Sequence, residues 1–375
     1  MYEVYSLKRI LNVQKHCDGG WFWTKYSAYP YTGCEYGCAY CYSREEKYNR
    51  LRASGCAEPV GLSDPFSEHI MVKENAPELL EKELRRKPRD LIYLDSYQPV
   101  EREYRYARKV LEICLHLGFP VFINEKSPLL LRDLDILQEI SEKSYLNVGW
   151  SIISTSDDTG KLAFEPKTPS YRSRFEAMKK LAEVGILTGT VFMPILPFVC
   201  DSEENIRAIV EKTKECCGKY VLDAGLTLNG NCKTHFFKAV ERLDPQLLEK
   251  YRELYGDPKA LVDRNRQAHQ LVLAFCMENG LSPKIPRPVK IYPKDLQVNK
   301  RIAETFYLEA RELQIAGQER AKEWAYRRAA WSLDDLEESV REIIRKRGAD
   351  ALLEIEGIGK SLADRIAAFL QENCE

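Results

Sequence analysis

The sequence has no apolar run near the roughly 20 residues needed to cross a bilayer. Its start, MYEVYSLKRI, lacks the apolar core of a signal peptide. The sequence also lacks an excess of positive or negative charge, because the formal net charge is −1. A neutral chain has no general attraction to nucleic acid or to an anionic membrane, so any such contact needs a local surface. These absences predict a cytoplasmic protein with no membrane partner.

The chain is otherwise ordinary in composition and long enough for two domains. Its 375 residues, 44% hydrophobic and 30% charged, suit one large globular domain and a smaller one. Twelve cysteines without a secretory signal indicate a reducing compartment, where thiols bind metal, do chemistry or fill cores. Cys114 and Cys276 lie in apolar helical patterns and are expected in the core.

Strand-like and helix-like stretches alternate over the first three quarters of the chain. The expected strands lie at residues 20–30, 90–96, 120–127, 145–153, 186–197 and 220–228. The expected helices lie at residues 76–87, 102–118, 129–141, 173–185, 202–218 and 244–280. Such alternation predicts parallel βαβ units with right-handed crossovers.

About six units are present, which is short of the eight in a closed barrel. The pattern therefore predicts an α/β fold of the partial (β/α)6 type, open on one side. In such folds the chemistry lies in the loops at the carboxyl ends of the strands. The loop around residues 33–44, "LDSYQP", "NEKSP" and "MPILPFVCD" all follow predicted strands, so we expect them to meet at one mouth.

The final quarter of the chain has a different character. Residues 282–293 carry several prolines, which prevent regular helix and predict an extended linker. Residues 294–375 are expected to be entirely helical. The sequence thus predicts a barrel domain over residues 1–281, the linker, and a C-terminal helical domain over residues 294–375.

Three cysteines in YPYTGCEYGCAYCYSR have the spacing Cx3Cx2C. Cys34, Cys38 and Cys41 are one ligand short of a tetrahedral structural zinc site. Their thiolates can instead bind three irons of a [4Fe–4S] cluster and leave the fourth iron open. Zinc with a distant fourth ligand, or unliganded thiols, are the alternatives.

At this loop the sequence resembles the radical S-adenosylmethionine (SAM) superfamily. The resemblance rests on the Cx3Cx2C spacing after the first strand, with an aromatic residue, Tyr40, before the last cysteine. It implies that SAM chelates the fourth iron through its amino and carboxylate groups. Electron transfer from the cluster then splits SAM into methionine and a 5′-deoxyadenosyl radical that removes hydrogen from the substrate.

Further motifs resemble one branch of that superfamily, the spore photoproduct lyase-like proteins. They run in order between about residues 20 and 235, among them "DSYQPVEREY", "NEKSPLLLRDLDIL" and "FEPKTPSYRSRFEAMKKLAEVGI". The resemblance implies that Ser96 and Ser151 contact the ribose or methionine part of SAM. It also implies that Lys126 faces the SAM carboxylate, for which a lysine ammonium is chemically suited. Glu165 and Arg174 are expected in the same pocket.

The resemblance also implies a radical path, and here the sequence departs from the branch. Tyr40 and Tyr42 match tyrosines that border the path. The cysteine that returns a hydrogen atom in spore photoproduct lyase aligns with Leu94, which cannot donate one, so authentic spore photoproduct repair is in doubt. Cys200, after the fifth strand, is the candidate replacement and Cys56 a second one, although both can be bystanders.

The end of the chain contains the sequence Gly357, Ile358, Gly359, Lys360 between two helical stretches. In a helix–hairpin–helix motif the glycines allow a tight turn whose N–H groups bind a DNA phosphate, and a lysine adds charge. Such contacts position nucleic acid without reading its bases. The alternative is that the glycine only ends one helix before another begins, without any role in DNA binding.

Residues 299–336 together with this hairpin resemble the helical N-terminal domain of family X DNA polymerases. The resemblance implies nucleic-acid binding, but the Schiff-base lysine of some relatives corresponds to Arg365, which cannot form an imine. The region is slightly acidic, with 13 basic and 16 acidic residues over 300–375. Arg345, Lys346, Arg347 and Lys360 are the candidate basic patch. Docking of a protein partner is the competing interpretation.

The sequence therefore predicts a lyase-like radical SAM enzyme that repairs or modifies DNA. Its expected cofactors are a [4Fe–4S] cluster and S-adenosylmethionine, and its expected partners are nucleic acid and an electron donor such as flavodoxin or ferredoxin. One alternative is radical SAM modification of RNA or of a peptide. Another is a non-catalytic DNA-binding protein with a metal or iron–sulfur centre.

Overall fold

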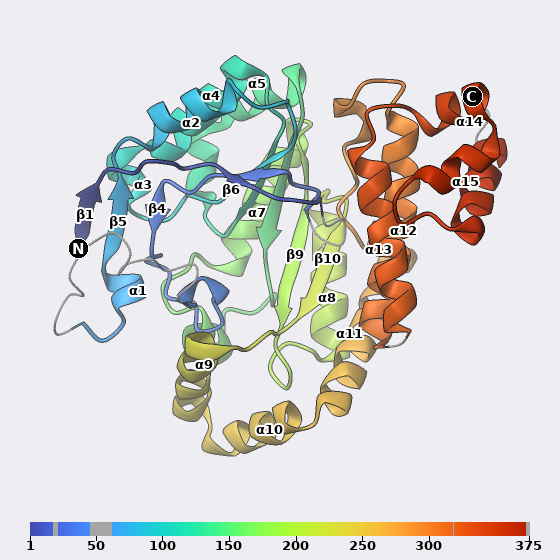
Figure 1. Cartoon of the computed structure of the whole chain (residues 1–375). Coiled ribbons are helices and arrows are strands. Elements are labelled where there is room, and N and C mark those ends of the chain that lie inside the picture. Colours follow the sequence, from blue (N-terminus) through green and yellow to red (C-terminus); the bar gives the residue numbers. More distant parts are fainter. Residues whose placement is uncertain (18–21, 46–61, 318, 373–375) are drawn as a thin grey trace. The chain divides into compact units, whose positions relative to one another are not determined.

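The computed structural model describes residues 1–17, 22–45, 62–317 and 319–372. It divides into two compact units. The first comprises Met1–Val13 and Tyr26–Ile285, and the second comprises Gln14–Lys25 and Pro286–Glu375. The chain therefore enters the second unit twice. Figure 1 shows the elements of both units in the order of the sequence.

A seven-stranded sheet forms the centre of the first unit, in the order β10-β9-β8-β7-β6-β3-β2. Its parallel strands are β3 (Tyr26–Ser27), β6 (Ile92–Leu94), β7 (Val121–Glu125), β8 (Leu146–Ser151), β9 (Leu187–Ile195) and β10 (Val221–Gly225). The edge strand β2 (Asn12–Val13) is antiparallel to β3. The six parallel strands confirm the predicted α/β fold of the partial (β/α)6 type.

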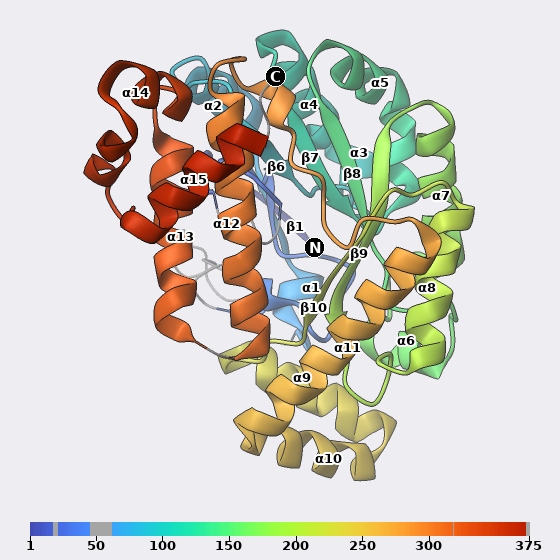
Figure 2. The same cartoon turned by 90° about the vertical axis from the view of Figure 1, so that its right-hand side faces the viewer.

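Helices cover the outer face of this sheet, as Figures 1 and 2 show. They are α2 (Ala76–Leu84), α4 (Tyr106–Leu117), α5 (Leu134–Lys143), α7 (Tyr171–Glu183), α8 (Glu203–Glu215) and α11 (Pro258–Asn279). Several begin at a side-chain cap, because Ser170, Ser202 and Asp257 accept hydrogen bonds from the first-turn amides of α7, α8 and α11. Each cap satisfies an amide that the helix itself leaves unpaired.

Further elements lie around the sheet. They are η1 (Tyr42–Arg44), α1 (Pro65–Glu68), α3 (Glu101–Tyr104), η3 (Pro128–Asp133), α6 (Thr159–Phe164), α9 (Gly230–Leu243) and α10 (Pro245–Gly256). A small second sheet has the order β1-β5-β4, with β1 (Tyr2–Tyr5), β4 (Tyr31–Thr32) and β5 (Ile70–Lys73). The sequence pattern did not predict this sheet, because its strands are short and come from three distant segments.

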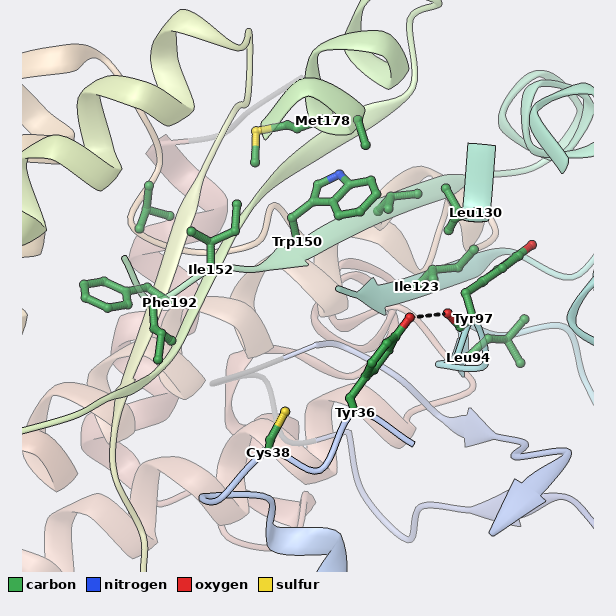
Figure 3. Packing of buried hydrophobic residues seen from close by; sticks show 14 of the residues in the cluster. Tyr36, Cys38, Leu94, Tyr97, Ile123, Leu130, Trp150, Ile152, Met178 and Phe192 are labelled. Atoms are coloured by element: carbon green, nitrogen blue, oxygen red, sulfur yellow. Dashed lines mark hydrogen bonds between the residues drawn. The ribbon is translucent and has the colours of Figure 1, made fainter. Parts of the chain in front are cut away.

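The alternation of side chains along each strand separates a core face from an inner face. Leu94, Ile123, Trp150 and Phe192 belong to the large hydrophobic core, and Figure 3 shows them with Met178 of α7. Their neighbours in sequence therefore point to the opposite, inner face of the curved sheet. Residues that continue this alternation past the strand ends lead into the loops where the chemistry is expected.

Two paired glycines make room on the inner face for one aromatic ring. Gly149 of β8 lies opposite Gly189 of β9. A Cβ atom on Gly189 would lie 2.5 Å from the carbonyl oxygen of Tyr220 and 2.8 Å from its Cγ atom. The Tyr220 hydroxyl in turn donates to Asn147 Oδ1 at 2.9 Å. The sheet can therefore hold this ring only where both strands lack side chains.

The second unit is helical throughout its C-terminal part. Its elements are η4 (Val289–Ile291), α12 (Gln297–Ala316), α13 (Arg320–Asp335), α14 (Val340–Arg347), η5 (Ala349–Glu354) and α15 (Lys360–Glu372). The proline-rich stretch is tied to this unit through Arg287, which is buried and donates to Asp334 and to the Lys300 carbonyl. Asn299 on α12 accepts the Val340 N–H at 2.9 Å and so caps the start of α14 from a neighbouring helix.

Replacement of Gly189 by alanine should destabilise the protein. We expect Gly189→Ala to lower the free energy of unfolding by about 1–3 kcal/mol, because the added methyl group meets the carbonyl oxygen and the buried ring of Tyr220. Gly256→Ala is the control, since Gly256 ends α10 and a Cβ atom there meets nothing within 4 Å. Urea unfolding followed by circular dichroism gives both values. Equal stabilities of the two variants would contradict this account of the inner face.

Candidate functional site

The cysteine loop follows β4 and is fixed by contacts to α1. Gly33 adopts φ = +84°, and a Cβ atom on it would lie 2.8 Å from the Phe66 carbonyl oxygen. Only glycine fits there without strain. The Cys34 N–H donates to the same Phe66 oxygen at 3.0 Å. The loop therefore begins at a defined point, one residue before its first cysteine.

Tight turns bring the three thiols together. The Gly37 N–H donates to the Cys34 carbonyl and the Cys41 N–H to the Cys38 carbonyl, both at 3.3 Å. Arg44 closes the loop, because its Nε atom donates to the Cys38 carbonyl at 3.1 Å while its guanidinium pairs with Asp64. The same buried Arg44 thus links the second turn of the loop to the residue that precedes α1.

The thiols are suited to a bound iron cluster rather than to free existence as thiolates. Burial raises the pKa of Cys34, and the charges of Cys38 and Cys41 raise it further. Burial likewise raises the pKa of Cys38, to about 12, and that of Cys41. Thiolates so placed repel one another and need positive charge from a metal to stay deprotonated. The donor set of three neighbouring sulfurs, with Cys38 buried and Cys34 and Cys41 partly buried, fits a [4Fe–4S] cluster.

A single metal ion needs at least three ligand side chains close enough to bind the same ion. Within residues 1–17, 22–45, 62–317 and 319–372, no group of three or more His, Cys, Asp or Glu side chains could hold one metal ion. In an iron–sulfur cluster each cysteine binds its own iron, so the sulfurs lie farther apart than around one ion. The cluster assignment is therefore compatible with the spacing of the loop.

The Lys126 side chain lies beside the cysteine loop and contacts residues from three other segments of the chain. It follows β7, and its ammonium donates to Ser151 Oγ at 2.5 Å, to Glu165 Oε1 at 3.0 Å and to the Tyr40 hydroxyl at 3.2 Å. Tyr40 also donates from its hydroxyl to Glu165. Two residues predicted from sequence, Tyr40 and Ser151, therefore meet at the ammonium of a third, Lys126.

Glu165 is fully buried and stays ionised because of its cationic neighbours. Burial alone would raise its pKa, but the charges of Arg174 and Lys126 and their hydrogen bonds hold that pKa well below the usual range. Arg174 donates to Glu165 Oε2 at 2.5 Å and to the Ser151 carbonyl at 2.8 Å. Thr168 adds a hydroxyl bond to the same carboxylate at 3.1 Å. The Glu165 carboxylate is thus paired with two cations, Arg174 at one oxygen and Lys126 at the other, where Tyr40 also binds.

Sequence reasoning missed a second buried carboxylate, Glu125. Its Oε1 atom accepts the amides of Ser96 and Tyr97, both at 2.8 Å, and its Oε2 atom accepts the Lys126 amide at 3.1 Å. It therefore ties the loop after β6 to the loop after β7 and places Ser96 beside the Lys126 loop. The only signal in the sequence was an acidic residue at the end of an otherwise apolar strand.

Leu94 does not face the inner side of the sheet. It lines a small buried cavity together with Ala107 and Val110 of α4, and Figure 3 shows it beside Ile123 and Tyr97. The neighbouring Tyr93 and Asp95 point the other way, where the Tyr93 hydroxyl donates to Asp95 Oδ2 at 3.1 Å. Burial and the charge of Glu125 raise the pKa of Asp95 to about 8. The residue at position 94 therefore does not border the mouth in this chain.

The other predicted residues of the radical path differ in exposure. Tyr42 lies directly after Cys41 and is 56% exposed. Cys200 is 2% exposed, and its sulfur accepts the Leu196 N–H at 3.0 Å. Cys56 lies outside the described residues.

The glycine hairpin of the second unit turns before α15. Gly357 adopts φ = +78°, and the Ile358 N–H donates to the Ile355 carbonyl at 3.0 Å. The Gly359 carbonyl accepts the amides of Leu362 and Ala363 and so starts the helix. A Cβ atom on Gly359 would meet nothing within 4 Å, and Lys360 is exposed beside it. Gly359 thus leaves its backbone open to an approaching ligand.

The candidate basic patch is largely paired internally. Arg345 bonds to Glu342, Lys346 to Glu338, and Arg347 to Glu338 and Glu354. Arg365, at the position of the Schiff-base lysine, is held by Glu309 and by the Tyr326 hydroxyl at 2.8 Å. The amides of the hairpin, rather than free side-chain charge, are therefore the feature of this unit suited to an anion.

No helix among the residues that the structure describes is long and apolar enough to span a membrane. Residues 28–210 match the family model of the Radical SAM superfamily, and residues 297–375 match that of a helix-hairpin-helix domain. An uncharacterized protein of Mycobacterium tuberculosis is 26% identical over 238 residues, which cover 62% of this chain and 67% of the relative. An uncharacterized protein of Methanocaldococcus jannaschii is 29% identical over 228 residues, covering 60% and 78% respectively.

Two solved structures are similar at lower identity. Spore photoproduct lyase complexed with dinucleoside spore photoproduct shares 17% identity and a TM-score of 0.46, over 65% of this chain and 66% of the other. The present chain thus spans just under two thirds of that lyase. Streptococcus suis SuiB bound to its precursor peptide SuiA shares 14% identity and a TM-score of 0.38, over 60% and 46%.

Removal of the Glu165 charge should destabilise the protein. We expect Glu165→Gln to lower the free energy of unfolding by about 3 kcal/mol, because Arg174 is left buried without an anionic partner. Arg172→Gln is the matched control on α7, the helix of Arg174, since the pair of Arg172 with Glu176 is exposed and contributes less than about 0.5 kcal/mol. Urea unfolding of both variants checks the difference, and a cost for Glu165→Gln as small as that of the control would refute the network.

The same variant should change how stability depends on pH. The pKa of Glu165 is lower in the folded protein, so its stabilising contribution is complete above the unfolded value of about 4.3. That contribution is lost as the pH falls further. Stability of the wild type should therefore decrease more steeply than that of Glu165→Gln below about pH 4.3, in unfolding curves measured at several pH values.

Proposed function

Since the chain contains a radical SAM domain and a helix–hairpin–helix domain, we propose that it is a radical SAM enzyme that acts on nucleic acid. Cys34, Cys38 and Cys41 hold a [4Fe–4S] cluster in this proposal. When bound, the cluster and SAM supply a 5′-deoxyadenosyl radical that removes a hydrogen atom from the substrate. The observation that carries the proposal is the meeting of Tyr40, Lys126 and Ser151 beside the cysteine loop.

The residues around Lys126 bind and orient SAM in this proposal. The Lys126 ammonium provides a cation for the SAM carboxylate, and Ser151 and Ser96 provide hydroxyl groups for the ribose or methionine part. Glu165 holds Lys126 at a fixed distance from Tyr40, and Glu125 holds Ser96 beside the Lys126 loop. Both carboxylates are buried, so they position the groups that touch SAM without facing it.

The substrate in this proposal is DNA with a lesion or a base to be modified, as the lyase-like motifs suggest. Leu94 packs against α4 and cannot donate a hydrogen atom, so the hydrogen donor in this proposal is another residue. Cys200 and Tyr42 remain the candidate members of the radical path. An external one-electron donor, such as flavodoxin or ferredoxin, would be the protein partner in this proposal.

The helix–hairpin–helix domain anchors the nucleic acid in this proposal. The amides beside Gly357 and Gly359 bind a backbone phosphate, and the positive end of α15 together with Lys360 supports the contact. Ile358 is 5% exposed and holds the turn against the domain. Because amides provide the contact, the acidic composition of this domain is compatible with DNA binding.

Loss of one cluster cysteine should abolish SAM cleavage. Under anaerobic, reducing conditions, Cys34→Ala should contain less iron and sulfide and form no 5′-deoxyadenosine, because one iron loses its thiolate. Cys217→Ala, at an exposed cysteine, is the control. Ultraviolet-damaged duplex, undamaged duplex, RNA and peptide are added in turn to the wild type. Zinc in place of iron and sulfide would favour the non-catalytic alternative, and stimulation by RNA or peptide alone would contradict a DNA substrate.

Gly359→Ala should weaken DNA binding without harming the fold. The new methyl group enters open space, so the free energy of unfolding should fall by no more than about 1 kcal/mol, the cost of alanine in place of glycine at a helix start. It covers the amides that would face a phosphate, so the dissociation constant for duplex DNA should rise about tenfold. Fluorescence anisotropy with the full chain measures this, with Gly256→Ala as control. An unchanged affinity would show that the hairpin does not contact DNA.

A further inference from the structure

Phe198 stands in a strained loop after β9 and is 37% exposed. Its φ angle is +65°, a left-handed conformation that bulky residues rarely adopt and that costs of the order of 1–3 kcal/mol. Glycine or asparagine would form the same turn with less strain. The backbone alone therefore gives no reason for a phenylalanine, and its ring must be considered.

The surrounding residues fix this loop firmly. The Phe198 N–H donates to Asp201 Oδ1 at 2.8 Å, and Arg264 of α11 donates to Asp201 Oδ2 at 2.5 Å. Tyr251 of α10 donates to the Pro197 carbonyl at 2.5 Å. Asn205 of α8 holds the Cys200 carbonyl at 2.7 Å. Contacts from three helices thus offset the backbone strain at Phe198, and they hold its ring in one position.

One side of the ring is occupied by a cation and part of the rest is open. The Arg264 guanidinium lies 3.9 Å from the centre of the Phe198 ring, and Tyr251 contacts it edge-on at 5.6 Å between ring centres. A flat aromatic ring backed by a guanidinium is a suitable stacking partner for another flat, electron-rich ring. Nucleobases are such rings, and proteins that bind single strands commonly stack them on phenylalanine.

The loop also lies at the mouth where the proposed chemistry takes place. It follows the carboxyl end of β9, as the Lys126 loop follows β7. Val199 lies 3.6 Å from the position of a Cβ atom on Gly160 of α6, and α6 leads directly to Glu165. Leu162 on α6 is 64% exposed. Two exposed apolar side chains therefore lie on neighbouring segments of this rim.

We propose that Phe198, backed by Arg264, stacks against an unpaired base of the nucleic-acid substrate and holds it at the mouth. This inference rests on the proposed function, because it assumes a nucleic acid as the substrate. The inference adds a residue that determines specificity, because the Phe198 ring favours a base that is not stacked within a duplex. The hairpin of the second unit, in contrast, binds backbone phosphates of any duplex. Two contacts of different chemistry then act on one substrate.

The test compares two duplexes that differ by one unpaired base. Fluorescence anisotropy with the full, cluster-loaded chain, without SAM or reductant, gives the dissociation constants. We expect the wild type to prefer the duplex with the unpaired base by about tenfold. Phe198→Asn should lose the preference and keep its urea midpoint, because asparagine tolerates the left-handed backbone. Phe198→Trp should retain the preference. Val184→Asn is the control, since Val184 is also 37% exposed but directly follows α7.

The possible results separate this inference from the proposed function. Gly359→Ala should weaken both duplexes equally, whereas Phe198→Asn should affect only the one with the unpaired base. A preference that survives in Phe198→Asn, or a large fall in its urea midpoint, would assign the ring to packing and overturn the inference. Binding to neither duplex would overturn the proposed DNA substrate. Displacement of the probe by an aromatic peptide would identify a peptide as the occupant and also overturn it.

Discussion

The carboxylate of Glu165 is the interaction on which the candidate site depends. It is buried, it bonds to Arg174 and Lys126, and it accepts the Tyr40 hydroxyl. Through these partners it connects α7, the loop after β7 and the cysteine loop, which are far apart in the sequence. A buried charge tolerates no movement of its partners, because each lost bond leaves an uncompensated ion. The position of Lys126 is therefore fixed by the same electrostatics that hold the fold together.

A second buried carboxylate extends this arrangement to the neighbouring strand. Glu125 binds amides of the loops after β6 and β7, so Ser96 and Lys126 are placed by backbone bonds and not by their own side chains. Substitution of Ser96 or Lys126 would then change what touches a ligand, while substitution of Glu125 would change where the loops lie. Rigid strand ends joined by buried acids give the precision that a reaction between bound groups requires.

Much of the fold could be predicted because its signals are local. The alternation of apolar strands with amphipathic helices located all six parallel strands, and the Cx3Cx2C spacing located the cysteine loop. The partners of Glu165 could not be deduced in this way, because Tyr40 and Arg174 are more than a hundred residues apart and meet only in the fold. The direction of Leu94 also required the structure, since a shift of one residue along a strand reverses the face. The left-handed backbone of Phe198 had no sequence signal, as phenylalanine is an unusual residue for it.

The chain's near-neutral charge is consistent with how the two units would share the work on nucleic acid. In the proposed function the hairpin amides bind phosphate by geometry and an aromatic ring binds a base by its face, so neither contact needs a strongly basic surface. The paired state of Arg345, Lys346 and Arg347 fits this division, because their charges are already used within the second unit. An enzyme built in this way gains little affinity from long-range attraction. In this proposal its selectivity comes from the aromatic ring, because only a base that is out of its stack exposes its face.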